Sequence, residues 1–124
     1  MDHTIVHFEI PADDVEALAK FYTELLGWKI EEMKEFEGMG YWGVYPSPSK
    51  AEGSLMGGMM KRMMPQQQPV NYVQVESVAE YLEKAKGLGA TVVVDKTEIP
   101  GMGWFGVMLD PQGNPLGLFE VMAK

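Results

Sequence analysis

Two stretches of the chain share one pattern of glycines and aromatic residues. The first reads Gly38-Met39-Gly40-Tyr41-Trp42-Gly43-Val44-Tyr45, and the second reads Gly101-Met102-Gly103-Trp104-Phe105-Gly106-Val107-Met108. Five of the eight positions are identical, and two more pair one aromatic residue with another. The offset of 63 residues (101 − 38) also carries Asp14-Val15 onto Ser77-Val78. This spacing predicts a tandem duplication of a unit of about sixty residues.

Each half of the sequence predicts the same order of elements. In the first half, alternation over His7–Ile10 predicts a strand, and the apolar row after Asp13 or Asp14 predicts a helix that ends at Gly27. Three further strands are expected near 28–34, 39–45 and 54–61. The second half predicts a strand at 70–75, a helix from the Ser77 cap to Gly87 or Gly89, and strands near 91–96, 103–109 and 116–122.

We therefore predict an α+β fold in which two tandem β-α-β-β-β units form a curved mixed sheet around a cleft. The units are expected at about 3–61 and 70–124 of a single domain 1–124, with a polar linker at 62–69. A four-stranded sheet with one helix leaves one face uncovered. The two uncovered faces are expected to enclose the cleft, which is where we expect a ligand or a reaction. The motif Asp110-Pro111-Gln112-Gly113-Asn114-Pro115 predicts a tight turn before the last strand.

Composition and charge exclude several classes of function. The chain has 124 residues, no cysteine and a net charge of −8, so disulfides, thiolate sites and nucleic-acid binding are not expected. Arg62 is the single arginine, which disfavours strongly anionic substrates. The sequence shows neither a secretory signal nor an apolar run long enough to span a membrane. We expect a soluble, cytoplasmic protein that does not bind membranes.

Four sets of residues together resemble one superfamily over essentially the whole chain. They are His7, then Phe21-Tyr22 with Leu25-Leu26-Gly27-Trp28, then the turn 110–115, and then Phe119-Glu120. The chain resembles the vicinal-oxygen-chelate superfamily, which includes glyoxalase I, bleomycin-resistance proteins and extradiol dioxygenases. The resemblance implies the two-unit fold, a cleft that binds a small molecule, and a homodimer.

The resemblance also implies a metal site, of which this sequence has only half. Metal-containing members use four protein ligands from the first and last strands of each unit, and His7 and Glu120 match two of these positions. The offset of 63 from His7 falls on Val70, and the reverse offset from Glu120 falls on Gly57, with no imidazole or carboxylate from there to Met60. We therefore predict no metal or other cofactor. The alternative is a divalent metal ion on His7 and Glu120.

The candidate site residues fall into two groups. His7 and Glu120 are the candidate catalytic residues, either as an acid–base pair or as ligands of that alternative metal ion. Predicted ligand-binding residues supply hydrogen bonds or apolar contacts, and these are Glu9, Tyr72, Gln74, Trp42, Trp104 and Met60. Strand alternation sends one member of each aromatic pair, 41–42 and 104–105, into the core, and the sequence does not say which.

Two functions follow from these expectations. The first is a small-molecule-binding protein with a degenerate metal site, acting without metal. The alternative is a metal-dependent lyase, isomerase or dioxygenase that uses His7 and Glu120, with Tyr72 or Gln74 as substitute ligands.

Overall fold

The chain folds into two compact units. The computed structural model describes residues 2–33, 40–47 and 55–122, so the ends of three predicted strands (34, 39 and 54) and the repeat residues Gly38 and Met39 lie outside the described residues. We call His7–Pro69 the first unit, and Met1–Val6 with Val70–Lys124 the second unit. The N-terminal segment thus groups with the second half of the chain, because the Gln74 backbone N–H donates to the Thr4 carbonyl at 3.2 Å.

The first unit has one helix and four strands, and the first strand begins two residues earlier, in the segment that groups with the second unit. In chain order they are β1 (Ile5–Ala12), α1 (Val15–Leu26), β2 (Lys29–Glu32), β3 (Tyr41–Tyr45) and β4 (Met56–Lys61). The strands lie side by side in the order β2-β3-β4-β1. β1 and β4 run parallel, and the other neighbours run antiparallel.

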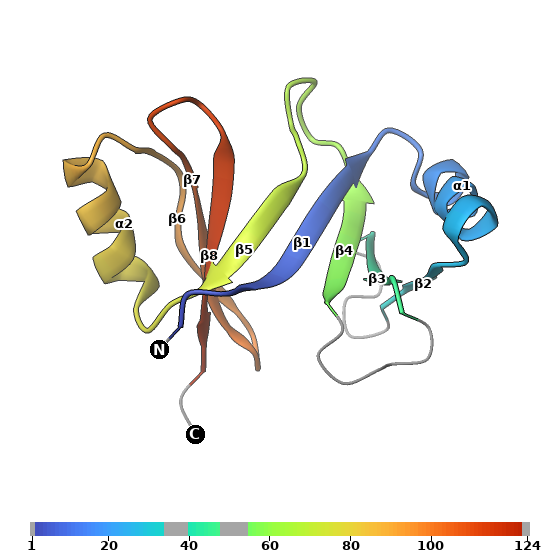
Figure 1. Ribbon diagram of the computed structural model, residues 1–124, viewed down its shortest axis with the longest axis horizontal. Coiled ribbons are helices and arrows are strands. Elements are labelled where there is room, and N and C mark those ends of the chain that lie inside the picture. Colours follow the sequence, from blue (N-terminus) through green and yellow to red (C-terminus); the bar gives the residue numbers. More distant parts are fainter. Residues whose placement is uncertain (1, 34–39, 48–54, 123–124) are drawn as a thin grey trace. The chain divides into compact units, whose positions relative to one another are not determined.

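The second unit repeats this plan. Its elements are β5 (Val70–Gln74), α2 (Val78–Gly87), β6 (Thr91–Ile99), β7 (Gly103–Leu109) and β8 (Pro115–Val121), with the strand order β5-β8-β7-β6 (Figure 1). β5 and β8 are parallel, and the other pairs are antiparallel. The prediction of an α+β fold with two β-α-β-β-β units and mixed strand directions is confirmed. The cleft between the units stays a prediction.

Local capping contacts explain where the helices begin and end. The Asp14 side chain accepts a hydrogen bond from the Ala17 N–H at 3.0 Å, and Gly27 ends α1 in the left-handed conformation with φ 74°. The Ser77 side chain accepts from the Glu80 N–H at 3.2 Å at the start of α2. In the predicted turn, the Asn114 backbone N–H and side chain lower the pKa of Asp110. Within the described residues, neither helix is long and apolar enough to cross a membrane.

Each helix covers one face of the sheet of its own unit. In the first unit, Val44 and Met59 are fully buried in the core beneath α1, with Phe8 and Ile10 of β1 packed against that core. In the second unit, the core beneath α2 consists of Val75, Val78, Leu82, Met108 and Leu118. Because side chains alternate along a strand, the residues between these core positions lie on the opposite side. We call that side the helix-free face of each unit.

Candidate functional site

Three polar side chains meet on the helix-free face of the first unit. His7 and Glu9 alternate with core residues on β1, and Tyr41 lies at the start of β3. The His7 Nε2 atom lies 2.9 Å from the Tyr41 hydroxyl oxygen, and the Tyr41 hydroxyl donates to the Glu9 Oε2 atom at 3.1 Å. The His7 Nε2 and Glu9 Oε2 atoms are 3.8 Å apart. We call these three residues the His7–Glu9–Tyr41 cluster.

A glycine between the strands makes this convergence possible. β4 lies between β1 and β3, and Gly58 on β4 is the register partner of Glu9. A Cβ atom at Gly58 would lie only 2.0 Å from the Tyr41 hydroxyl oxygen. The tyrosine ring therefore crosses β4 over a position that has no side chain. Any larger residue at position 58 would push the Tyr41 hydroxyl away from His7 and Glu9.

The surroundings of Tyr41 set the positions of the protons in the cluster. Burial, followed by the negative charge of Glu9 and the hydrogen bond to it, raises the pKa of Tyr41 far above its ordinary value. The phenol therefore stays protonated, and its single proton goes to Glu9. Since a hydroxyl has one proton to donate, the His7 Nε2 atom is the donor in its contact with Tyr41. The cluster thus combines an oriented imidazole with a carboxylate.

The cluster does not fit a metal ion. It offers one imidazole and one carboxylate, whereas catalytic zinc sites generally have about three protein ligands. Tyr41 is held as a neutral phenol, and its hydroxyl is already hydrogen-bonded to both neighbours. Within 2–33, 40–47 and 55–122, no three His, Asp or Glu side chains gather in a way that could hold a metal ion.

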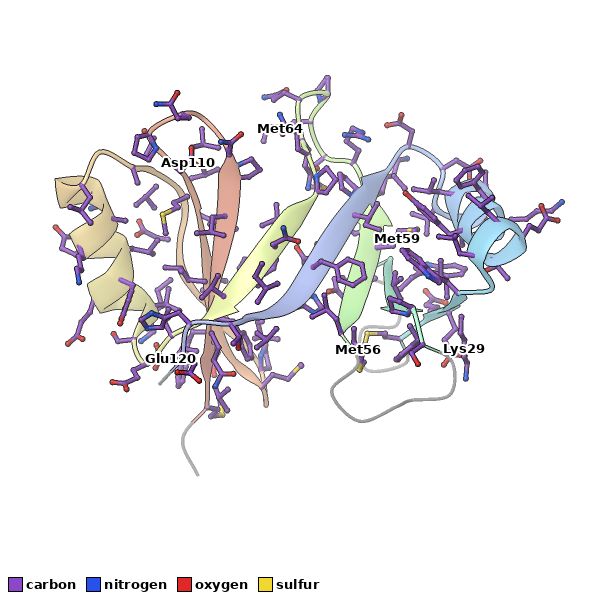
Figure 2. All side chains as sticks on the ribbon, in the orientation of Figure 1. Lys29, Met56, Met59, Met64, Asp110 and Glu120 are labelled. Atoms are coloured by element: carbon purple, nitrogen blue, oxygen red, sulfur yellow. The ribbon has the colours of Figure 1, made fainter. Side chains whose placement is uncertain are left out.

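Glu120 does not lie on the helix-free face of its unit, where we expected the candidate catalytic residues. It shares a face of β8 with the core residue Leu118, and that is the face covered by α2. Its Oε1 atom accepts a hydrogen bond from the Val78 backbone N–H at 2.9 Å, and Lys96 Nζ is 3.9 Å from the same oxygen. Figure 2 shows Glu120 near the start of α2, where a carboxylate stabilises the helix N-terminus. Helix capping thus accounts for a carboxylate among apolar neighbours.

The two tryptophans predicted to bind a ligand, Trp42 and Trp104, also lie on the helix sides of their sheets, not on the helix-free faces. Trp42 packs against the core of the first unit, and Trp104 packs against the core of the second. Lys96 Nζ lies 4.8 Å from the centre of the Trp104 ring. Strand alternation therefore leaves Tyr41 and Phe105 as the members of the two aromatic pairs on the helix-free faces.

The remaining predicted ligand-binding residues lie on helix-free faces. Met60 is the register partner of Tyr41 in the first unit. In the second unit, Tyr72 and Gln74 alternate with the core-facing Val73 and Val75. Tyr72 is only 5% exposed, and its ring covers Gly117, where a Cβ atom would lie 2.3 Å from a ring carbon. The Tyr72 and Phe105 rings pack edge to face with centroids 6.4 Å apart.

Tyr41 is the member of the cluster that the sequence did not single out. It was one of two adjacent aromatic residues, and either could have faced the core. The signal that points to it is the glycine pair Gly57-Gly58 on β4, because a strand glycine often marks a close approach by another group. That signal becomes specific only when the register of β3 against β4 is known.

A hollow of about 540 Å³ lies at the start of the predicted linker. It is lined by Asp13, Arg62, Met63, Met64 and Pro65. The Arg62 Nε atom lies 3.0 Å from the Asp13 carboxylate, and its guanidinium also donates to the Gln67 carbonyl. The ion pair between Arg62 and Asp13 therefore connects the start of the linker to the residue that follows β1.

The comparisons with known proteins agree with this fold. Residues 6–119 match the model of a family described as a glyoxalase-like domain. No curated protein matches the sequence. Among solved structures, the chain is similar to a methylmalonyl-CoA epimerase variant from Streptomyces coelicolor in complex with 2-nitronate-propionyl-CoA, with a TM-score of 0.67 at 16% identity, covering 98% of this chain and 100% of that one.

Two further structures have a similar fold at low identity. A methylmalonyl-CoA epimerase from Mycobacterium tuberculosis gives a TM-score of 0.61 at 15% identity, covering 99% of this chain and 94% of that chain. A hypothetical protein from Bacillus halodurans gives a TM-score of 0.65 at 12% identity, covering 100% and 98%. At these identities the similarity shows the fold alone, whereas the family model spans nearly all of the chain. The chain therefore belongs to the glyoxalase-like domain family of the vicinal-oxygen-chelate superfamily, as its sequence motifs predicted.

Proposed function

We propose that this protein binds a small organic molecule without a metal ion, and that the His7–Glu9–Tyr41 cluster orients it. One observation carries the proposal. The three polar groups are hydrogen-bonded together on a face that α1 does not cover. The His7 and Glu9 side chains are 33% and 24% exposed, so they are partly open to a ligand while their positions are fixed. Partly exposed polar groups held in this way favour a defined binding geometry.

The chemistry of the cluster indicates the class of ligand. Glu9 is a hydrogen-bond acceptor, and the net charge of −8 repels anions, so a neutral or cationic ligand with at least one N–H or O–H donor fits best. Met60 lies beside Tyr41 and offers a flexible apolar contact. Tyr72 and Gln74 remain predicted contacts on the helix-free face of the second unit. Helix capping and core packing account for Glu120, Trp42 and Trp104, which are therefore not part of the proposed site.

Calorimetry with fragments tests this proposal. A panel of neutral and cationic aromatic fragments, each with a hydrogen-bond donor, is first screened by thermal shift. For each hit, we expect His7→Ala, Glu9→Gln and Tyr41→Phe to weaken binding by roughly tenfold each, since each removes a hydrogen bond to or within the site. Tyr81→Phe is the matched control, because it removes a tyrosine hydroxyl that lies 3.0 Å from His3 in the second unit. Hits whose affinity is the same in all four variants would contradict the proposed site.

Metal titration tests the proposal that the protein acts without a metal ion. Ni²⁺, Zn²⁺, Mn²⁺ and Fe²⁺ are added in excess while the melting temperature is followed. A ligand that binds only the folded state raises the melting temperature, so we expect no rise with any of the four ions. A rise that His7→Ala abolishes would show a metal site at the cluster and overturn the metal-free proposal. A rise that both His7→Ala and Glu120→Gln abolish would revive the alternative that pairs His7 with Glu120.

A second candidate function is proton transfer at a carbon acid. The observation that favours it is the chain of hydrogen bonds that joins the His7 imidazole to the Tyr41 hydroxyl and this hydroxyl to the Glu9 carboxylate. These contacts orient His7 as an acid–base group. The probe is a neutral thioester with a proton beside its carbonyl, because the net charge of −8 disfavours a strongly anionic coenzyme A ester. In D₂O, an active enzyme would replace the proton beside the thioester carbonyl with a deuteron, and His7→Gln would abolish the exchange. Absence of exchange in the wild type leaves binding as the function.

A further inference from the structure

A second tyrosine of β3, Tyr45, shares the helix-free face of the first unit with the His7–Glu9–Tyr41 cluster. It is the last residue of β3 and follows Val44, which lies in the core. Because side chains alternate along a strand, Tyr45 and Gly43 point to the side opposite Val44. A Cβ atom at Gly43 would lie 2.9 Å from the Tyr45 hydroxyl oxygen and 3.1 Å from two carbons of its ring. The Tyr45 ring therefore bends back over Gly43, towards the middle of the sheet.

Two glycines in register bring the Tyr45 hydroxyl close to the cluster. Gly43 on β3 pairs with Gly58 on β4, and the Tyr41 hydroxyl lies over Gly58 in the same way. Register partners point to the same face, with their Cβ positions about 5 Å apart. Each hydroxyl oxygen lies within 2.9 Å of one of these Cβ positions, so the two oxygens are at most about 10 Å apart. A one-ring compound with a polar group at each end spans such a distance.

The Tyr45 hydroxyl has no hydrogen-bond partner in the part of the chain that the structure describes. In that part of the chain, every fully buried side-chain oxygen or nitrogen has a partner, so the hydroxyl of the partly buried Tyr45 is open to solvent. The carboxylate of Glu31, the register partner of Gly43 on β2, lies 3.7 Å from Lys29 Nζ instead. The phenol proton of Tyr45 is thus available to a bound molecule.

The protons within the cluster are used in its own hydrogen bonds. The Tyr41 proton goes to Glu9, and the proton on the His7 Nε2 atom goes to Tyr41. Glu9 gives the site a hydrogen-bond acceptor, and a hydroxyl with its own proton adds a donor. Tyr45 therefore complements the cluster, because it can bind an oxygen acceptor on the same molecule whose N–H or O–H group binds Glu9.

We propose that Tyr45 is a further ligand-binding residue, whose hydroxyl donates a hydrogen bond to a carbonyl oxygen of the ligand. This inference rests on the proposed function, since it assigns a second contact to the same ligand. It also narrows the class of ligand to small neutral or cationic molecules with an N–H or O–H donor at one end and a carbonyl group at the other. Glu9 accepts from the donor, and Tyr45 donates to the carbonyl.

Two probes of similar shape test the contact with Tyr45. The compound para-aminoacetophenone carries an amine and a carbonyl at opposite ends of one ring, and para-ethylaniline has a methylene group in place of the carbonyl. By calorimetry, we expect the wild type to bind the carbonyl probe about fivefold more tightly, as one hydrogen bond allows. Tyr45→Phe abolishes this preference and leaves the affinity for para-ethylaniline within about twofold of the wild type. Tyr81→Phe, which removes a tyrosine hydroxyl in the second unit, keeps the preference.

A second variant tests the place of the ring. In Gly43→Ala, the new Cβ atom displaces the Tyr45 hydroxyl, and the preference for the carbonyl probe is lost as in Tyr45→Phe. Gly87→Ala is the matched control, because nothing lies within 4 Å of a Cβ atom there. The melting temperature of Tyr45→Phe equals that of the wild type, since no hydrogen bond within the described residues is lost. A purely structural role would instead lower the melting temperature and leave the preference intact.

Two results would each overturn the inference. One is a wild type that binds the carbonyl probe no more tightly than para-ethylaniline. The other is a preference that Tyr45→Phe retains, since the carbonyl would then bind elsewhere. Glu9→Gln tells these failures from a failure of the proposed function. It weakens the binding of both probes if the cluster is the site, and unchanged binding of both probes would show that the proposed function itself is wrong.

Discussion

Each unit holds one of the two histidines of the chain against a tyrosine hydroxyl, and the two pairs differ in their surroundings. In the first unit, the partly buried His7 contacts Tyr41 at 2.9 Å on the sheet, and Tyr41 also donates to Glu9. In the second unit, His3 contacts Tyr81 at 3.0 Å on the surface of α2, with the two rings edge to face at 5.3 Å.

The difference teaches that the histidine–tyrosine contact does not make a site by itself. The first pair differs from the second in two ways. A carboxylate two residues along the strand accepts the hydrogen bond of the tyrosine, and a glycine lets the tyrosine ring cross β4. The hydrogen bond of the second pair is exposed, so water competes for it. Four predictions break or sharpen this contrast.

A side chain at position 58 is expected to have the largest effect, because it disrupts the contact between His7 and Tyr41. In Gly58→Val, the new side chain occupies the space of the Tyr41 hydroxyl, and we expect the free energy of unfolding to fall by about 2 kcal/mol. Urea denaturation measures the change. Gly87→Ala is the control, since nothing lies within 4 Å of a Cβ atom there and alanine suits a helix end. Equal stability of the two variants would show that Tyr41 does not cross β4.

Removing the tyrosine hydroxyl destabilises the protein more in the first pair than in the second. Tyr41→Phe leaves His7 and Glu9 without their common partner in a partly buried place, so we expect a loss of about 1–2 kcal/mol in the free energy of unfolding. Tyr81→Phe removes an exposed hydroxyl and costs less than about 0.5 kcal/mol. The same denaturation measurement compares them. A larger loss in Tyr81→Phe than in Tyr41→Phe would reverse the contrast.

Alkaline pH sharpens the contrast through the raised pKa of Tyr41. A tyrosine whose pKa is higher in the folded than in the unfolded state stabilises the fold below the unfolded value of 10.0, and that stability is lost as the pH rises above it. Between pH 10 and about pH 11, the free energy of unfolding should fall by about 1 kcal/mol on this account. Tyr41→Phe should lack this part of the decrease. Equal alkaline slopes in both proteins would contradict the raised pKa.

The smallest effect concerns the second pair. Lys84 Nζ lies 6.0 Å from the centre of the Tyr81 ring, at the limit of a cation–π contact. We expect Lys84→Met to change the free energy of unfolding by less than about 0.5 kcal/mol and to leave the NMR signals of His7 unchanged. A shift of the His7 signals would show that the two pairs are not independent.

The sequence predicted the elements well because their signals are local. Ser77 with Glu80 begins α2, Gly27 ends α1, and the turn at 110–115 precedes β8, as expected. Each of these signals depends on backbone hydrogen bonds or on φ within a few residues.

The site was harder to predict because it depends on which face each strand turns to the helix. The offset of 63 aligns Tyr41 with Trp104, yet Tyr41 lies on a helix-free face and Trp104 packs against a core. A shift of one residue exchanges the two faces of a strand, so a repeat found in the sequence does not fix which side chains share a surface. Glu120 shows the same limit, because the sequence does not reveal that it lies against the start of α2.

The most direct test of the central claim uses the two histidines as reporters. Carbon–proton NMR spectra of the imidazole groups contain one set of signals from His7 and one from His3, and Tyr41→Phe and Tyr81→Phe assign them. A fragment selected by thermal shift is then titrated into the metal-free protein. Our account predicts that the His7 signals move in a saturable way while the His3 signals stay in place. Movement of His3 alone, or movement of His7 only after a divalent metal ion is added, would contradict it.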